Sequence, residues 1–207
     1  MKRAVFLDRD GVIVRDPPHY AHRLDQLKLI PGSASAIRLL NEYDFKVIVV
    51  SNQSGIGRGY YTEEDVISFN HVMNIMLEKE GAWIDDIYYC PHHPDTNCRC
   101  RKPGIGMLKR AEKKWTINLM QSFMIGDKQS DIEAGKRAGC KTILVETGHG
   151  AEELKNNKIE CDFIAKDLFN AVDAFLLTNP KWKFNELLPN DEGNCGLGIL
   201  LEKDNDA

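Results

Sequence analysis

Carboxylates, basic side chains and thiols occur in separate segments whose residue types suit phosphate chemistry. Asp8 and Asp10 stand two residues apart in an Asp-x-Asp-Gly motif that follows an apolar run. The first carboxylate of such a pair can attack phosphorus, and the second can protonate the leaving oxygen and later activate water. Gly11 lets the chain turn there without a side chain in the way. Alone, the motif is a weak signal, because a turn after a strand explains it about as well.

A site with two carboxylates needs positive charge to hold a phosphate, and distant segments supply it. Lys102, in Arg-Lys-Pro-Gly, can neutralise a transferring phosphoryl group. Asp127, in Gly-Asp-Lys, can hold Mg²⁺ together with Asp8, because this ion prefers oxygen ligands. Ser51 and the main-chain amides of the next two residues can donate hydrogen bonds to the phosphate oxygens. These segments predict a magnesium-dependent site for phosphoryl transfer.

A dense group of cysteines and histidines indicates a second metal. The predicted zinc ligands are Cys90, His92, Cys98 and Cys100, which can close a tetrahedral sphere. His93 is excluded, because it points away from its neighbour on an extended chain. A loop of reduced thiols and a redox pair at the last two cysteines are the alternatives. Four ligands leave no open position, so the zinc is expected to be structural and to fix the loop before Arg101 and Lys102.

The elements that must position these residues follow from the hydrophobic pattern. Six apolar runs predict strands: Ala4–Asp8, Phe45–Asn52, Asp86–Cys90, Phe123–Asp127, Thr142–Glu146 and Asp162–Ala165. Five amphipathic stretches predict helices: Gly32–Tyr43, Thr62–Glu80, Met107–Trp115, Ser130–Ala138 and Glu152–Asn156. The first four strands are nearly continuous in apolar residues and are expected to be buried on both faces. This alternation predicts an α/β fold, a three-layer, doubly wound (Rossmann-like) parallel sheet that binds ligands at the carboxyl ends of its strands.

Taken together, the segments resemble the haloacid dehalogenase-like superfamily of phosphotransferases. The stretches LDRDGVI, SNQSGIGRG, YYCPHHP, CRCRKP and GDK carry this resemblance. Within the superfamily they resemble the D-glycero-D-manno-heptose 1,7-bisphosphate 7-phosphatases, and only slightly less the histidinol-phosphate phosphatases, which share the zinc loop. The resemblance implies a haloacid dehalogenase-like fold with a minimal cap and a zinc-stapled loop.

The same resemblance implies roles for individual residues. Asp8 is the expected nucleophile, and Asp10 the general acid and base, with Ser51 and Lys102 completing the catalytic set. Mg²⁺ is expected on Asp8, the main-chain carbonyl of Asp10, and Asp127, whereas Asp131 stays outside the metal set. The residues expected to contact substrate are Asp16, His19, Ser51, Asn52, Gln53, Ser54, Arg101, Lys102 and Lys128. His149 is assigned to a loop away from the substrate.

These roles predict hydrolysis of a phosphomonoester through an aspartyl-phosphate, with the 7-phosphate of D-glycero-D-manno-heptose 1,7-bisphosphate as the expected target. Histidinol phosphate or another small phosphorylated metabolite is the alternative, because the segment from Asp16 to His19 and the stretch between His92 and Cys98 depart from the family's usual pattern. A non-catalytic, metal-stapled binding module is less favoured, since such descendants usually lose one of the motif acids. Transfer of the phosphate to an acceptor other than water is a third option. A large cap that excludes water would favour it, and we find no such cap in the sequence.

Composition limits the possible partners and the domain plan. The 207 residues carry a net charge of -4, which gives no global electrostatic reason to bind nucleic acid or anionic lipid. No apolar run approaches the ~20 residues of a membrane span. We therefore expect a cytoplasmic monomer that acts on a small phosphorylated metabolite, with no nucleic-acid or membrane partner. Residues 1–177 are the expected phosphatase domain, with the zinc loop at 90–100, and residues 178–207 a C-terminal extension.

Overall fold

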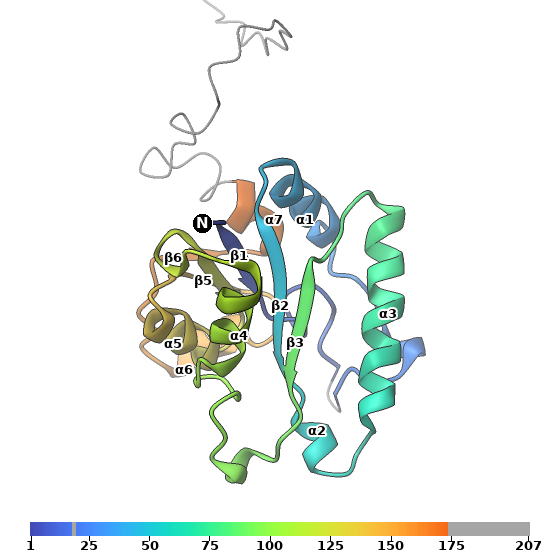
Figure 1. The fold of residues 1–207 in the computed structure, drawn as a ribbon. Helices are drawn as coiled ribbons and strands as arrows, with labels where there is room; N and C mark the ends of the chain where they lie inside the picture. Colours follow the sequence, from blue (N-terminus) through green and yellow to red (C-terminus); the bar gives the residue numbers. More distant parts are fainter. Residues whose placement is uncertain (18–19, 174–207) are drawn as a thin grey trace, which may run out of the picture.

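One parallel sheet forms the centre of the structure, a computed structural model that describes residues 1–17 and 20–173 (Figure 1). The strands are β1 (Ala4–Leu7), β2 (Lys46–Asn52), β3 (Asp86–Cys90), β4 (Phe123–Gly126), β5 (Lys141–Val145) and β6 (Phe163–Ala165). Their order across the sheet is β3-β2-β1-β4-β5-β6, and every neighbouring pair is parallel. This order confirms the predicted doubly wound α/β fold and places the carboxyl ends of β1, β2 and β4 side by side.

Helices cover both faces of the sheet. They are α1 (Ser33–Glu42), α2 (Ser54–Gly57), α3 (Glu63–Lys79), α4 (Gly106–Trp115), α5 (Gln129–Ala138), α6 (Gly150–Asn156) and α7 (Leu168–Asn170). Val5 and Leu7 of β1 share one hydrophobic core with α1, α3 and α7. Ala4 and Phe6 point to the opposite face and pack with α4 and α5. The two cores hold the strands rigidly, so the loops at the strand ends have fixed starting points.

The predicted helices occur at the expected places, and their observed ends differ from the predicted ends by at most two residues. Helix α3 begins after Thr62, whose hydroxyl accepts a hydrogen bond from the amide of Asp65, while the Asp65 carboxylate accepts one from the Thr62 amide. The pattern did not predict α2, α7 or three short 3₁₀ segments, Leu24–Gln26, Pro94–Thr96 and Leu119–Gln121. These segments are too short to show an amphipathic period.

The prediction that β3 is buried on both faces is wrong. Tyr88 and Cys90 are buried, whereas the other residues of β3 are half-buried. The reason is its place at the edge of the sheet, where, among the described residues, a strand pairs with it on one side only.

The connection from β1 to α1 bears on access to the site. Its described residues form a 3₁₀ turn and two isolated β-bridges and contain no inserted domain (Figure 1), which agrees with the expected minimal cap. None of the described helices is long and apolar enough to cross a membrane. The predicted contact residue His19 and the predicted extension 178–207 lie outside the described residues.

Candidate active site and metal centres

A cavity of about 650 Å³ opens at the carboxyl ends of β1, β2 and β4. Clefts of this size at the strand ends of parallel sheets commonly hold small ligands. Of the residues predicted to contact substrate, those that line the cavity are Asp16, Ser51, Asn52, Gln53, Ser54, Arg101, Lys102 and Lys128. Asp8 and Asp10 line it as well. The structure therefore brings together segments that are up to 120 positions apart in the sequence.

A buried ion-pair cluster forms the floor of the cavity. The Lys102 ammonium lies 2.9 Å from Oδ1 of Asp8 and 2.7 Å from Oδ1 of Asp131, and it donates to the carbonyl of Val50. Burial alone would raise the pKa of Asp8, but the ammonium groups of Lys102 and Lys128 outweigh it and hold that pKa below its usual value. Asp8 is therefore ionised at neutral pH, as a nucleophile must be.

Three carboxylates lie close enough to share a cation. Oxygens of Asp8, Asp127 and Asp131 all lie within 4.8 Å of one another. Burial, followed by the charge of Asp8, raises the pKa of Asp127 to about 8, and its Oδ1 is a buried atom without a hydrogen-bond partner among the described residues. Gly11 has a φ of +85°, and a Cβ there would overlap Oδ2 of Asp127. The free oxygen and the excess negative charge fit Mg²⁺, which takes carboxylate ligands.

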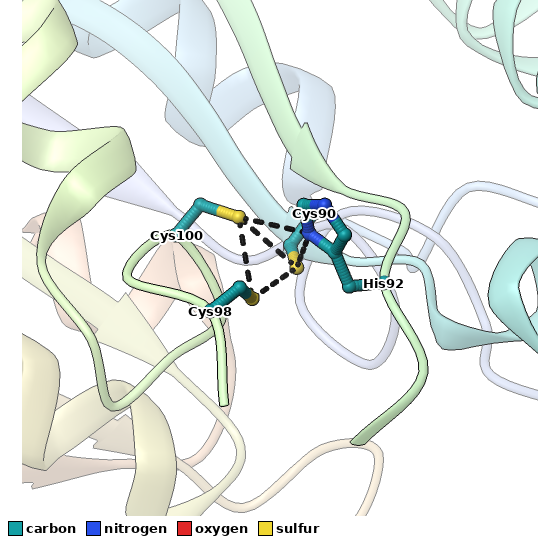
Figure 2. A group of neighbouring side chains, drawn as sticks. All are labelled: Cys90, His92, Cys98 and Cys100. Carbon is teal, nitrogen blue, oxygen red and sulfur yellow. Dashed lines mark hydrogen bonds between the residues drawn. The ribbon is translucent and has the colours of Figure 1, made fainter. Parts of the chain in front are cut away.

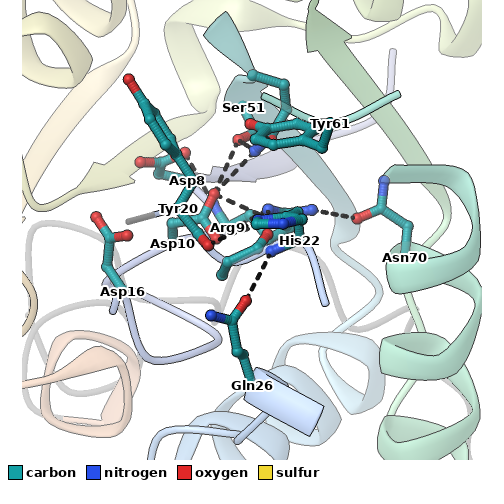
Figure 3. A network of polar contacts seen from close by, with 12 residues as sticks. Asp8, Arg9, Asp10, Asp16, Tyr20, His22, Gln26, Ser51, Tyr61 and Asn70 are labelled. Carbon is teal, nitrogen blue, oxygen red and sulfur yellow. Dashed lines mark hydrogen bonds and ion pairs between the residues drawn. The ribbon is translucent and has the colours of Figure 1, made fainter. Parts of the chain in front are cut away.

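The Asp10 carboxylate is not part of this acid cluster. One of its partners is the guanidinium of Arg9, 3.0 Å from Oδ1 (Figure 3). The other is the amide of Gln53, which donates to Oδ2 at 2.9 Å. The Ser51 hydroxyl lies 3.5 Å from the same Oδ2. Burial raises the pKa of Asp10 even though Arg9 opposes this shift. A raised pKa favours the protonated carboxyl group that a general acid requires. It also agrees with the expectation that only the main-chain carbonyl of Asp10 faces a metal.

Two predicted substrate contacts have their side chains engaged within the protein. The Asn52 amide donates to the carbonyl of Lys102 and accepts from its main-chain N–H, so it fixes the Lys102 loop on β2. Gln53 donates to Asp10 and Ser51 and accepts from the hydroxyl of Tyr61. Both residues line the cavity, but their amide groups orient neighbouring residues.

Several cavity residues were not among the predicted substrate contacts. They are Pro17, Tyr20, Ala21, Arg58, Pro94, Ser130, Asp131, Gly148, His149 and Glu152. His149 lies in a loop, as predicted, and this loop position lines the cavity. Its Nε2 lies 3.1 Å from Oδ2 of Asp16, which also lies 3.3 Å from the ammonium of Lys128. Two of them, Arg58 and Pro94, lay within the quoted stretches SNQSGIGRG and YYCPHHP, which could have drawn attention to them.

An arginine side chain with a nitrogen that lacks a hydrogen-bond partner among residues 1–17 and 20–173 also lines the cavity. Nη1 of Arg101 is buried and makes no hydrogen bond to any described residue. Burying an unpaired guanidinium nitrogen costs free energy unless a ligand satisfies it. An anionic group is the natural partner, because guanidinium binds carboxylate and phosphate through parallel hydrogen bonds.

The predicted zinc ligands converge at the carboxyl end of β3 (Figure 2). The sulfur of Cys100 lies 3.3–3.4 Å from the sulfurs of Cys90 and Cys98 and from Nδ1 of His92, and the Cys90 sulfur lies 3.5 Å from the Cys98 sulfur and from Nδ1 of His92. These are too long for a disulfide, whereas a tetrahedral site with bonds of about 2.3 Å has edges of roughly 3.8 Å. Gly57 of α2 lies against the main chain of this loop, where a Cβ would overlap the His93 nitrogen. The chemistry and spacing of the four ligands fit Zn²⁺.

Comparisons with known proteins agree with this geometry. A family model described as HAD-hydrolase-like matches residues 99–171. A protein of Chlorobaculum tepidum named D-glycero-D-manno-heptose-1,7-bisphosphate 7-phosphatase is 38% identical over 191 residues, which cover 86% of this chain and 96% of that protein. A Pasteurella multocida protein named D-glycero-beta-D-manno-heptose-1,7-bisphosphate 7-phosphatase is 40% identical over 175 residues, covering 81% of this chain and 94% of the relative.

A solved structure shows the same relationship in three dimensions. The D,D-heptose 1,7-bisphosphate phosphatase of B. bronchiseptica, crystallised with magnesium and phosphate, superposes with a TM-score of 0.80 at 33% identity. The match covers 85% of this chain and 98% of that structure. The fold and the acidic site therefore define a haloacid dehalogenase-like phosphatase. Within that class, the chain belongs to the D-glycero-D-manno-heptose-1,7-bisphosphate 7-phosphatase family.

Proposed function

We propose that this protein hydrolyses the 7-phosphate of D-glycero-D-manno-heptose 1,7-bisphosphate through an aspartyl-phosphate on Asp8. The observation that carries the proposal is the opposite shift in the pKa values of two neighbouring carboxyl groups. Asp8 is held ionised by Lys102, whereas the pKa of Asp10 is raised and its carboxylate is clamped in the same cavity. Two carboxyl groups whose environments separate their pKa values are typical of a nucleophile beside an acid and base.

The chemistry takes place in two steps. An oxygen of Asp8 bonds to phosphorus while the bond to the leaving oxygen breaks, and the proton of the Asp10 carboxyl passes to that oxygen. Water then attacks phosphorus and gives its proton to Asp10, which frees the Asp8 carboxylate and phosphate. Lys102 offsets the charge of the transferring group, and Ser51 donates a hydrogen bond to it.

The carboxylates of Asp8 and Asp127, with the main-chain carbonyl of Asp10, are the proposed Mg²⁺ ligands, and Asp131 completes the acidic surroundings. When bound, this ion supplies charge neutralisation and alignment of the phosphoryl group. The cysteine cluster is the proposed structural zinc site. Since Arg101 follows Cys100 directly, zinc would fix the segment that presents Arg101 and Lys102.

A bisphosphate needs two anion sites, and the cavity offers them at separate places. Lys102 and Lys128 serve the reacting phosphate beside Asp8, as their effect on the Asp8 pKa indicates. The unpaired Arg101 nitrogen is the proposed anchor for the second phosphate. Arg58, an exposed arginine on the same cavity wall, can add further positive charge.

The purified protein with Mg²⁺ should be assayed on a panel of heptose 1,7-bisphosphate, histidinol phosphate, fructose 1,6-bisphosphate and nucleotides. We expect the highest kcat/KM for the heptose bisphosphate, and phosphorus NMR of the product should show that the 1-phosphate remains. A higher kcat/KM for histidinol phosphate, or loss of the 1-phosphate, would refute this substrate assignment.

A further inference from the structure

Arg9 is a buried arginine between the two motif aspartates, with only 1% of its surface exposed. It does not line the cavity, although Asp8 and Asp10 on either side of it do. Each of its three guanidinium nitrogens has an oxygen partner. Nε donates to the Asp10 carboxylate at 3.1 Å, Nη1 to Oδ1 of Asn70 at 3.0 Å, and Nη2 to the carbonyl of Ala21 at 2.7 Å (Figure 3).

These contacts join three elements that approach the site from different sides. Asn70 belongs to α3, Ala21 belongs to the segment that lines the cavity beside Tyr20, and Asp10 follows β1. The guanidinium also lies over the ring of Phe69, 4.5 Å from its centroid. Because each of its nitrogens has an acceptor and one face lies over Phe69, the plane of this guanidinium is fixed.

We propose that Arg9 is a positioning residue that fixes the Asp10 carboxylate in the orientation required for proton transfer to the leaving oxygen. The Asp10 carboxylate contacts Arg9 along the Nε and Nη2 edge of the guanidinium and Gln53 from the opposite side. A planar fork sets the plane of a carboxylate, whereas the single ammonium of a lysine does not. The inference rests on the proposed function, because it assigns to Asp10 the acid and base role stated there.

This role predicts a dependence on the leaving group. An alkoxide such as that of a sugar leaves only when it receives a proton, whereas p-nitrophenolate leaves without one. A misdirected Asp10 therefore slows the first step for an alkyl phosphate and spares it for an aryl phosphate. A misplacement of about 1 Å can cost roughly 100-fold in rate.

The test is a rapid-quench measurement of the first turnover with Arg9→Lys in the presence of Mg²⁺. The two substrates are a sugar phosphate and p-nitrophenyl phosphate. We expect the first-turnover rate to fall about 10- to 100-fold for the sugar phosphate, with the p-nitrophenol rate little changed. Steady-state turnover of both should fall, because water attack in the second step also uses Asp10.

A double-mutant cycle separates positioning from a purely structural role. If Arg9 acts through Asp10, Arg9→Lys should add no further loss in an Asp10→Asn background. Arg3→Lys is the matched control, because Arg3 also lies over a phenylalanine, Phe45, and precedes the same strand away from the cavity. This control should leave the ratio of the two first-turnover rates unchanged.

Equal losses for both substrates, or an undiminished loss in the Asp10→Asn background, would overturn the role of Arg9. If Arg9→Lys fails to fold, Asn70→Ala serves as a second variant, because it releases one end of the guanidinium. It should slow the first turnover of the sugar phosphate selectively, by a smaller factor than Arg9→Lys. An equal loss for both substrates would again overturn the role. Failure of the proposed function has a different signature. In that case the wild-type protein would form no acid-trapped phosphoryl-enzyme, and Asp8→Asn would remain active.

Discussion

The ammonium of Lys102 lies 2.7 Å from Oδ1 of Asp131, and the side chains of both residues are 1% exposed. Burial would lower the pKa of Lys102, but Asp131 and Asp8 raise it, so the lysine is charged throughout the physiological pH range. Asp131 thus fixes the cation that faces the nucleophile. The geometry predicts which of two substitutions in this cluster lowers the stability of the protein more.

Lys102→Met should destabilise the metal-free protein more than Asp131→Asn does. Removing the lysine leaves two buried carboxylates without their cation, which costs about 3–5 kcal/mol. Removing the Asp131 charge leaves Lys102 on Asp8 and on the Val50 carbonyl, so the loss is nearer 1.5–3 kcal/mol, about that of one charged hydrogen bond. Urea unfolding measures both, and equal losses would contradict the ordering.

Asp8→Asn should abolish turnover and keep the fold. The amide nearly matches the carboxylate in shape but cannot attack phosphorus. Since one negative charge disappears beside the phosphate, phosphate binding should become tighter. Phosphate release, circular dichroism and calorimetric titration with phosphate check these points. Substantial residual activity in a preparation free of contaminating phosphatase would refute the nucleophile assignment.

Arg101→Ala should lower kcat/KM for the bisphosphate roughly 10- to 100-fold, since a charged hydrogen bond is worth about 1.5–3 kcal/mol. A small monophosphate such as p-nitrophenyl phosphate has no second group for Arg101 and should lose much less. Arg99→Ala is the matched control, because it removes the same charge from an exposed position of the same loop. Equal losses on both substrates would assign Arg101 to the reacting phosphate.

Elemental analysis of protein purified without added metal should find one zinc per chain. Cys98→Ser should lose this zinc and raise KM, because the loop before Arg101 is no longer fixed. Cys161→Ser is the control, since Cys161 lies outside the cluster of ligands. A zinc-free preparation with full activity would refute the structural role of zinc at this cluster.

Asp162 provides a test of pH-dependent stability away from the metals. Burial would raise its pKa, but hydrogen bonds from Thr142 and Lys141 outweigh this and hold the pKa below its usual value. The folded state therefore gains stability above the unfolded pKa, about 3.9, and loses it as pH falls through the lower folded pKa. Asp162→Asn should weaken the protein at pH 7 and make little difference at acid pH, where the carboxyl is protonated. Urea midpoints at several pH values measure this.

The sequence alone determined the strand and helix pattern, the doubly wound fold and the segments that meet in the site. It could do so because buried parallel strands are apolar on both faces and carry their polar residues at one end. The cluster of three cysteines and one histidine was equally predictable, since its residue types suit one metal and its members are close in the chain. Asp8, Asp10 and Lys102 followed from short motifs.

Only the tertiary structure decided which way the polar side chains point. Asn52 and Gln53 bind the Lys102 main chain and Asp10 because β2 lies beside β1 and the Lys102 loop, a proximity that spacing along the chain does not encode. Asp131 joins the acid cluster because α5 begins directly above the end of β4. Arg9 is buried because α3 covers it with Asn70. A side chain's direction is set by its packing against distant elements, which local sequence does not specify.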